Sequence, residues 1–188
     1  MAIETTSLPG VLIYTPQVHK DARGFFCESY NYETWRKAGI DTVFVQDNHS
    51  RSAQGALRGL HFQLPPAAQV KLLRVTRGAV WDVAVDIRAG SPTLGQWVGV
   101  ELTEDNFRQL YIPEGFAHGF CVLSDSADVQ YKTSRVYSPA HEQGIAWNDA
   151  ALGIAWPTQT PLLSERDRTA QTLAEYLAKT PFAYEGQT

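Results

Sequence analysis

Two histidines stand in glycine-rich surroundings, which is where a ligand or a backbone can approach a side chain closely. His61 lies in the segment RGLHFQ, and His118 lies in PEGFAHGF. An imidazole changes charge near neutral pH, so a histidine is suited to general acid or base work. A lone histidine is more often a hydrogen-bonded structural residue. From the residues alone, both interpretations stay open for His61 and His118.

A lysine breaks the apolar pattern of a predicted strand. In the run KLLRVTR, Lys71 shares its parity with Leu73 and Val75, so it points to the apolar side. A charge buried there without a partner is costly. The alternative is an edge position, where the lysine stem covers apolar surface and the ammonium reaches water.

Two tyrosines share one face of a strand predicted over residues 129–136. Tyr131 and Tyr137 have the same parity as Thr133 and Arg135. Two rings on one face are typical of core packing. They also fit a pocket in which one hydroxyl does chemistry and one ring stacks on a ligand.

The segment Ser164-Glu165-Arg166-Asp167 has the Ser-x-x-Asp spacing of a helix capping box. That structural role accounts for Asp167 without any chemistry.

Polar side chains gather in two short stretches, residues 21–28 and 46–50, and Arg58 follows them. Their donors and acceptors could hold a phosphorylated or nucleotide-bearing ligand through charge-assisted hydrogen bonds. Because the chain has no Gly-rich phosphate loop, arginine side chains would have to hold the phosphate. A net charge of −4 argues against a nucleic acid polymer as the partner.

The elements that must position these residues read mainly as strands. Alternation of apolar and polar residues predicts strands over 79–87 and 98–102, with one face of the first turned to a core and Asp82 and Asp86 on the other face. Further strands are expected over 108–112, 118–123 and 129–136. Strands that follow one another after such short connecting segments favour an antiparallel sandwich or barrel. Helices are expected only over 31–38 and 169–179.

The 188 residues show no repeat and no low-complexity linker, so one domain over 1–188 is expected. The 44% apolar and 11% aromatic content suits a packed globule. Two cysteines are too few for a disulfide framework, and reduced thiols in a cytoplasmic protein are expected. No signal peptide and no apolar run long enough for a membrane span is recognisable.

The segment from Pro113 to His118 resembles the second sequence motif of the cupin superfamily of jelly-roll barrels. In metal-binding cupins the first motif supplies a His-x-His pair. Here that stretch reads His61-Phe62-Gln63, so the second ligand is missing. A metal needs three or more well-placed ligands, and the sequence therefore predicts a cupin barrel without a metal site.

Over roughly residues 8 to 175 the chain resembles the dTDP-4-dehydrorhamnose 3,5-epimerase family. The matching segments are DARGFFCESY from Asp21, QDNHSRS from Gln46, LRGLHFQ from Leu57, QVKLLRV from Gln69, DVAVDIR from Asp82, SPTLGQW from Ser91, IPEGFAHGF from Ile112, IAWND from Ile145 and LSERD from Leu163. Many short motifs in one order are far more specific than any single motif. The resemblance implies a mainly β, cupin-type jelly roll with short peripheral helices.

The resemblance also implies roles for individual residues. His61 would be the general base, Tyr131 the general acid on the opposite face, and Asp167 the partner of the base. Lys71 would lie near the sugar ketone, and Tyr137 would stack on thymine. The nucleotide contacts would be Arg23, Glu28, Gln46, Asn48, Arg58, His118, Glu142 and Arg166. Arg166 departs from the family pattern, in which a lysine is expected.

The implied reaction is cofactor-independent epimerisation of a dTDP-4-keto-6-deoxysugar at C3 and C5. Epimerisation at C3 alone or at C5 alone is the nearest alternative. The resemblance further implies a homodimer that exchanges N-terminal strands, and the segment 8–14 is apolar enough to add a strand. Two alternative functions of other classes are that of a non-catalytic sugar-binding cupin and that of a metal-dependent cupin oxygenase. The first would lack His61 or Tyr131, and the second would need the missing histidine.

Overall fold

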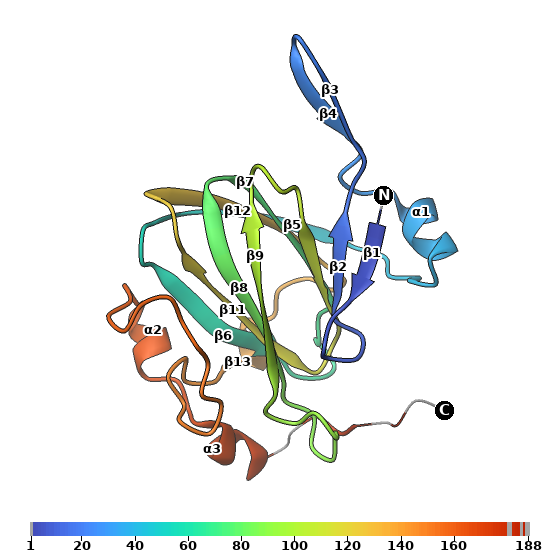
Figure 1. Ribbon diagram of the computed structural model, residues 1–188. Coiled ribbons are helices and arrows are strands. Elements are labelled where there is room, and N and C mark those ends of the chain that lie inside the picture. The colour runs from blue at the N-terminus through green and yellow to red at the C-terminus, as the bar shows by residue number, and fades with distance from the viewer. Residues whose placement is uncertain (1, 180–181, 185, 187–188) are drawn as a thin grey trace.

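The structure is a computed structural model that describes residues 2–179, 182–184 and 186. Two antiparallel sheets face each other and form a jelly-roll barrel (Figure 1). The mainly β fold predicted from the sequence is confirmed. The six-stranded sheet has the order β1 (Ala2–Thr5), β2 (Leu12–Thr15), β10 (Gln109–Ile112), β7 (Lys71–Arg77), β12 (Ser126–Thr133) and β5 (Gln46–Ala53). The five-stranded sheet has the order β13 (Glu142–Gly144), β6 (Leu57–Gln63), β11 (Phe116–Val122), β8 (Ala79–Asp86) and β9 (Trp97–Thr103).

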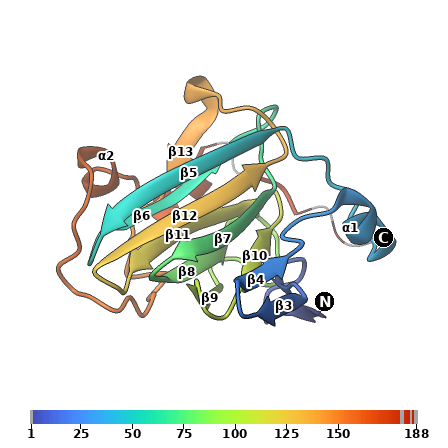
Figure 2. The same cartoon turned by 90° about the horizontal axis from the view of Figure 1, so that it is seen from above.

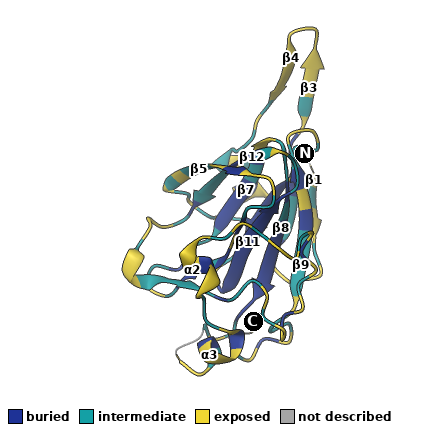
Figure 3. Ribbon diagram, turned by 90° about the vertical axis from the view of Figure 1, so that its left-hand side faces the viewer, coloured by how far each residue is buried: buried dark blue, intermediate teal, exposed yellow. Residues whose placement is uncertain are grey.

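A separate hairpin stands clear of both sheets. It consists of β3 (Val18–Asp21) and β4 (Gly24–Cys27), and it projects from one end of the barrel (Figures 1 and 3). Two large apolar side chains of this hairpin face outward, since Phe25 is 61% exposed and Phe26 is 70% exposed.

Short helices lie at the periphery. Helix α1 (Tyr32–Lys37) begins at Asn31, whose side chain caps two backbone N–H groups, and it confirms the helix expected over 31–38. Helix α2 (Glu165–Arg168) lies across the barrel from α1 (Figure 2). Within the described ranges, no helix has the length and apolar character needed to cross a membrane.

The C-terminal helix predicted over 169–179 is shorter than expected. Helix α3 spans only Leu173–Leu177, because Thr172 and Glu175 form a reciprocal capping box that fixes its start. The capping role expected of Ser164 is confirmed, since its hydroxyl accepts the backbone N–H of Asp167 at the start of α2.

The strand predicted over 129–136 is shifted toward the N-terminus. It spans Ser126–Thr133 as β12, and the Thr133 hydroxyl then donates to the carbonyl of Arg135 where the chain leaves the sheet. Tyr137 therefore lies in a loop, and the expectation that it shares a strand face with Tyr131 is wrong. A one-turn 3-10 helix, η1 (Pro139–His141), follows this loop.

The main core fills the space between the two sheets, with Leu73, Val80, Phe120 and Val129 among its members. A second apolar cluster covers the outer face of the five-stranded sheet with residues from the C-terminal third of the chain. A third, around Trp35 of α1, covers part of the outer face of the six-stranded sheet.

Strand β8 is buried on both faces, as its dark colour in Figure 3 shows. The sequence predicted one core face, but Val83 and Val85 pack in the outer cluster while Val80 and Ala84 pack between the sheets. Asp82 points to the inner side with them and is fully buried.

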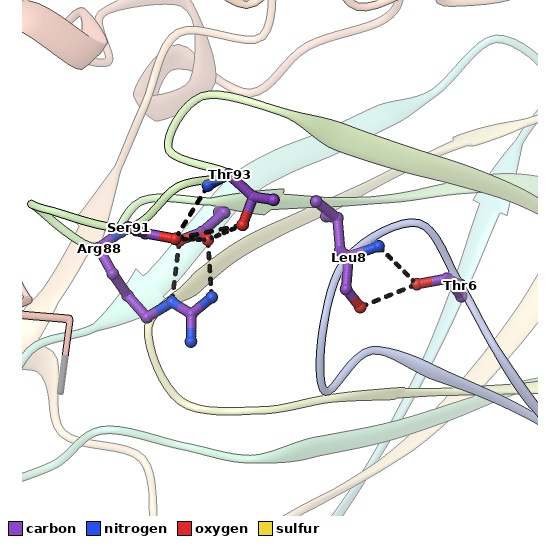
Figure 4. A network of polar contacts seen from close by, with 6 residues as sticks. Thr6, Leu8, Arg88, Ser91 and Thr93 are labelled. Atoms are coloured by element: carbon purple, nitrogen blue, oxygen red, sulfur yellow. Dashed lines mark hydrogen bonds and ion pairs between the residues drawn. The ribbon is translucent and has the colours of Figure 1, made fainter. Parts of the chain in front are cut away.

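The turn after β8 is built around the buried carboxylate of Asp86. Arg88, Ser91 and Thr93 donate hydrogen bonds to it with donor–acceptor distances of 2.6 to 3.0 Å. Figure 4 shows these three residues close together in one network. Burial raises the pKa of Asp86, but these hydrogen bonds outweigh it and hold the pKa below the usual range. The network fixes the connection between β8 and β9.

Candidate active site

A cavity of about 190 Å³ opens between the two sheets, lined mainly by residues of β5, β6, β7, β11 and β12. Its walls carry most of the residues singled out in the sequence. Nine of them line it: Gln46, Asn48, Arg58, His61, Lys71, His118, Tyr131, Tyr137 and Glu142. Residues from positions 46 to 142 thus meet in one place because the sheets fold over each other.

His61 projects from β6 and is oriented from behind by an acid. Its Nε2 lies 2.6 Å from Oδ1 of Asp167, and the other carboxylate oxygen accepts the hydroxyl of Ser164 at 2.8 Å. Burial raises the pKa of Asp167, but the bonds from His61 and Ser164 lower it below the usual range. An ionised carboxylate only accepts hydrogen bonds, so Nε2 carries the proton and Nδ1 is the ring nitrogen left to act as a base.

Lys71 begins β7 and is only 9% exposed, so of the two alternatives left open by the sequence, the buried lysine is the one observed. Its Nζ donates to the carbonyl oxygen of His61 at 3.2 Å. Burial lowers the pKa of Lys71 to about 8, although the charges of Asp82 and Glu142 oppose that shift. The ammonium is therefore held in a water-poor site, where electrostatic interactions are strong.

His118 lies on β11 opposite His61 of β6 and forms a second, more deeply buried pair with an acid. Its Nε2 lies 3.0 and 3.1 Å from the two carboxylate oxygens of Asp82. Burial lowers the pKa of His118, and the nearby Asp82 only partly offsets this.

Tyr131 projects from β12 of the six-stranded sheet, whereas His61 belongs to the five-stranded sheet. The two side chains therefore enter the cavity from opposite walls. Burial raises the pKa of Tyr131, and the charge of Glu142 adds to the effect while Arg58 opposes it. The phenol keeps its proton at neutral pH and can donate it.

The cavity rim holds a chain of charged and polar groups. The hydroxyl of Tyr137 donates to Glu142, and Nη1 of Arg166 lies 2.6 Å from the same carboxylate oxygen. Burial raises the pKa of Glu142, but Arg166 and Tyr137 hold it below the usual range. Arg58 also lines the cavity, and its Nε donates to the Ser52 hydroxyl at 2.9 Å.

Three predicted binding residues do not line this cavity: Arg166 only pairs with Glu142, which lines it, and Arg23 and Glu28 are not brought to it. Arg23 lies at the turn of the β3–β4 hairpin, pairs with Asp21 and has a 90% exposed side chain. Glu28 follows the hairpin and accepts a bond from the side chain of Asn31. The hairpin that carries Arg23 projects from the barrel (Figure 1).

Some residues of the site were not singled out in the sequence. Asp82 does not line the cavity itself but pairs with His118, which does. It was assigned to the non-core side of its strand, although an acid inside an apolar run was a signal. Gln63, Gln69 and Phe120 line the cavity and gave no signal of their own.

No metal cluster is found in the described part of the chain, where no group of three or more His, Cys, Asp or Glu side chains could hold an ion. The position at which metal-binding cupins carry their second histidine is Gln63. Its amide is already hydrogen-bonded to the backbone at both ends.

Comparison with known proteins agrees with this geometry. The family model described as dTDP-4-dehydrorhamnose 3,5-epimerase matches residues 5–175. A protein of that name from Shigella flexneri is 55% identical over 176 residues, which cover 93% of this chain and 97% of the relative. A dTDP-4-dehydrorhamnose 3-epimerase from Streptomyces niveus is 43% identical over 93% of this chain and 85% of the relative.

Solved structures agree as well. An epimerase from Legionella pneumophila, determined in complex with dTDP-4-keto-L-rhamnose, superposes with a TM-score of 0.95 at 46% identity, covering 98% of this chain and 99% of the other. Fold, motifs and whole-length similarity point the same way, and the chain therefore belongs to the dTDP-4-dehydrorhamnose 3,5-epimerase family.

Proposed function

We propose that the protein is an isomerase that epimerises dTDP-4-keto-6-deoxy-D-glucose at C3 and C5, giving dTDP-4-keto-L-rhamnose without a cofactor. The observation that carries the proposal is the entry of His61 and Tyr131 into one cavity from opposite sheets. An epimerase needs a base and an acid on opposite faces of the sugar, and this arrangement supplies both.

The chemistry follows from the ketone at C4. Protons on C3 and C5 are both adjacent to it, so removal of either leaves an enolate. In our proposal Nδ1 of His61 takes the proton, and Tyr131 returns a proton to the same carbon from the other face. Asp167 stabilises the imidazolium that forms, as the acid of a catalytic triad does.

Lys71 supports the same proposal because it places a cation in the cavity wall. Its ammonium would stabilise the negative charge that develops on the C4 oxygen when the enolate forms. The low exposure of this lysine makes such an interaction stronger than it would be in water.

Solvent deuterium tests the proposal. The purified protein is incubated with dTDP-4-keto-6-deoxyglucose in deuterated water, and the sugar is examined by NMR and mass spectrometry. We expect deuterium at both C3 and C5. Tight binding of dTDP without any exchange would identify a sugar-binding module and would contradict an enzymatic function.

Epimerisation at C3 alone is the second candidate. It is favoured by the similarity to the Streptomyces niveus 3-epimerase and to ChmJ, a 3'-monoepimerase from Streptomyces bikiniensis that superposes with a TM-score of 0.88 at 40% identity. Deuterium at C3 with an unlabelled C5 would establish this activity in place of the double epimerisation.

We further propose a homodimer in which the hairpin of one protomer completes the cavity of the other. The projecting hairpin with its exposed Phe25 and Phe26, and the absence of Arg23 from the lining of its own cavity, support this arrangement. A cytoplasmic location is part of the same proposal, since both Cys27 and Cys121 are unpaired and free thiols persist in a reducing compartment.

A further inference from the structure

One cavity-lining residue has no part in the chemistry proposed above. Gln63 is the last residue of β6, and only 4% of its surface is exposed. It shares a strand face with His61, while Phe62 between them packs in the outer apolar cluster. A buried amide needs hydrogen-bond partners at both ends.

Both ends of the Gln63 amide are engaged by the backbone of loops. Oε1 accepts the N–H of Ser138 at 2.7 Å, and Nε2 donates to the carbonyl oxygen of Ala67 at 2.8 Å. One side chain thus ties the loop after β6 to the loop after β12. The two bonds also fix which end of the amide faces which loop, because an N–H needs an acceptor and a carbonyl needs a donor.

The residue before Ser138 is Tyr137, whose ring is 49% exposed at the cavity rim. Tyr137 lies beyond the last ladder of β12, so no strand holds it in place. Its own backbone N–H donates to Oε1 of Gln46 at 2.9 Å, and its hydroxyl donates to Glu142. Of the two side chains that accept the backbone N–H groups of Tyr137 and Ser138, Gln63 is buried, whereas Gln46 is half-buried.

We propose that Gln63 is a positioning residue that fixes the ring of Tyr137 as a stacking plate for the nucleobase. The inference rests on the proposed dTDP-sugar substrate. A loop that is already held before binding loses less conformational entropy when the ligand arrives. Gln63 would therefore increase affinity for the base and leave proton transfer at the sugar to other residues.

The test uses Gln63→Met, which keeps the length and approximate shape of the side chain but removes both hydrogen bonds. Gln54→Met is the matched control, because Gln54 is exposed and its amide donates to a carbonyl at 3.2 Å outside the cavity. Binding of dTDP and of inorganic pyrophosphate is measured by calorimetry, and initial rates give kcat and KM. Thermal unfolding of each variant shows that it is folded.

Loss of a loop tether should weaken dTDP binding and raise KM by about tenfold in Gln63→Met, the equivalent of one or two hydrogen bonds. Pyrophosphate affinity and kcat should stay near those of the wild type, because pyrophosphate has no base to stack. In a Tyr137→Ala background, adding Gln63→Met should weaken dTDP binding little further, since two residues acting through one contact are not additive.

A second variant keeps the test decisive if Gln63→Met unfolds. Gln63→Glu retains an acceptor for Ser138 but places an oxygen where the donor to Ala67 was, so its dTDP affinity should fall below that of the wild type. Wild-type dTDP affinity in Gln63→Met, equal weakening of pyrophosphate, or full additivity with Tyr137→Ala would each overturn the inference. Absence of dTDP binding and of deuterium exchange in the wild type would instead overturn the proposed function and the inference with it.

Discussion

Asp167 combines a structural and a chemical role at a single position. Its backbone N–H is capped by Ser164 at the start of α2, and its carboxylate meets Nε2 of His61. The capping interpretation made from the sequence is thus correct but incomplete. A helix of one turn holds the acid at a fixed distance from the base.

Replacement of Asp167 by Asn should separate these roles. The amide can keep the helix start, but it no longer stabilises an imidazolium and can favour the wrong tautomer. We expect kcat to fall by about a thousandfold or more, with dTDP affinity nearly unchanged. Ser164→Ala is the control, since it removes the neighbouring bond and should reduce kcat far less. A large loss of dTDP affinity in Asp167→Asn would assign the acid to binding.

Lys71 predicts a pH dependence for the reaction. Burial lowers its pKa to about 8, so the ammonium is lost as the pH rises through that value. Activity should therefore decline above about pH 8, and kcat/KM measured across pH 6 to 10 reports this limb. Lys71→Arg should remove the limb from this range, because a guanidinium stays charged. An alkaline limb that persists in Lys71→Arg would belong to another group.

The same lysine has the opposite effect on stability. Its pKa is lower in the folded chain than in the unfolded one, so between about pH 8 and its ordinary pKa of 10.5 only the unfolded chain keeps the proton. Stability from this group therefore increases as the pH rises through that window and is lowest below it. The protein retains a cation that opposes folding at neutral pH, which is consistent with a functional role.

At the scale of elements, the contact between β6 and β11 places the two histidines. The register of this pair shifts between His118 and Phe120, and Gly59 and Gly119 face each other there. Gly59 has a backbone φ of 136°, a value that residues with a side chain rarely adopt. A Cβ on Gly119 would lie 2.8 Å from the carbonyl oxygen of Arg58. The two strands can approach so closely only because both residues lack a side chain.

Gly119→Ala should therefore destabilise the fold by about 1–3 kcal/mol through overpacking, and it should displace Arg58 and His61. Urea unfolding gives the stability, and the dTDP dissociation constant reports the position of Arg58. Gly186→Ala is a suitable control, because a Cβ there would have its nearest neighbour at 3.9 Å. Unchanged stability in Gly119→Ala would show that β6 and β11 can separate without loss.

Sequence patterns located β8 to β11 to within about two residues, since apolar alternation marks strands that border a core. β5 was not predicted as a strand, because both of its faces are polar. Gln46, Asn48 and Ser50 line the cavity, while Asp47 and His49 between them are exposed. A strand that serves a cavity on one side and solvent on the other gives no apolar signal.

Site residues were predictable where a motif or a broken pattern marked them. His61 and Lys71 are of this kind, and the structure brings both to one cavity. The roles of Asp82 and Gln63 were not predictable, because Asp82 pairs with His118 and Gln63 bonds to Ser138, both far away in the chain. Local periodicity carries no information about such distant contacts.

At the scale of the whole molecule, the proposed homodimer would divide each site between two chains. Arg23 and His61 would then act at the same cavity from different protomers. A mixture of two impaired variants tests this directly, because a mixed dimer contains one cavity in which both residues are intact.

Arg23→Ala and His61→Ala should each be impaired alone, the first through a raised KM and the second through kcat. Mixed dimers, made by co-expression with two affinity tags, should recover up to half of the wild-type activity per dimer. The doubly substituted homodimer is the control and should stay inactive. A mixed dimer no more active than its parents would show that Arg23 does not act across protomers, and a monomer in light scattering would exclude the arrangement.

The burial of β8 on both faces has a consequence for how the site moves. Backbone amides of β8 bond to β9 and β11, so their hydrogen exchange should require global unfolding. Amides of the loop that carries Tyr137 lie outside the sheets and should exchange through local opening. The acid that pairs with His118, Asp82, thus belongs to the most protected part of the barrel. Bound dTDP should therefore slow exchange chiefly in the loop that carries Tyr137.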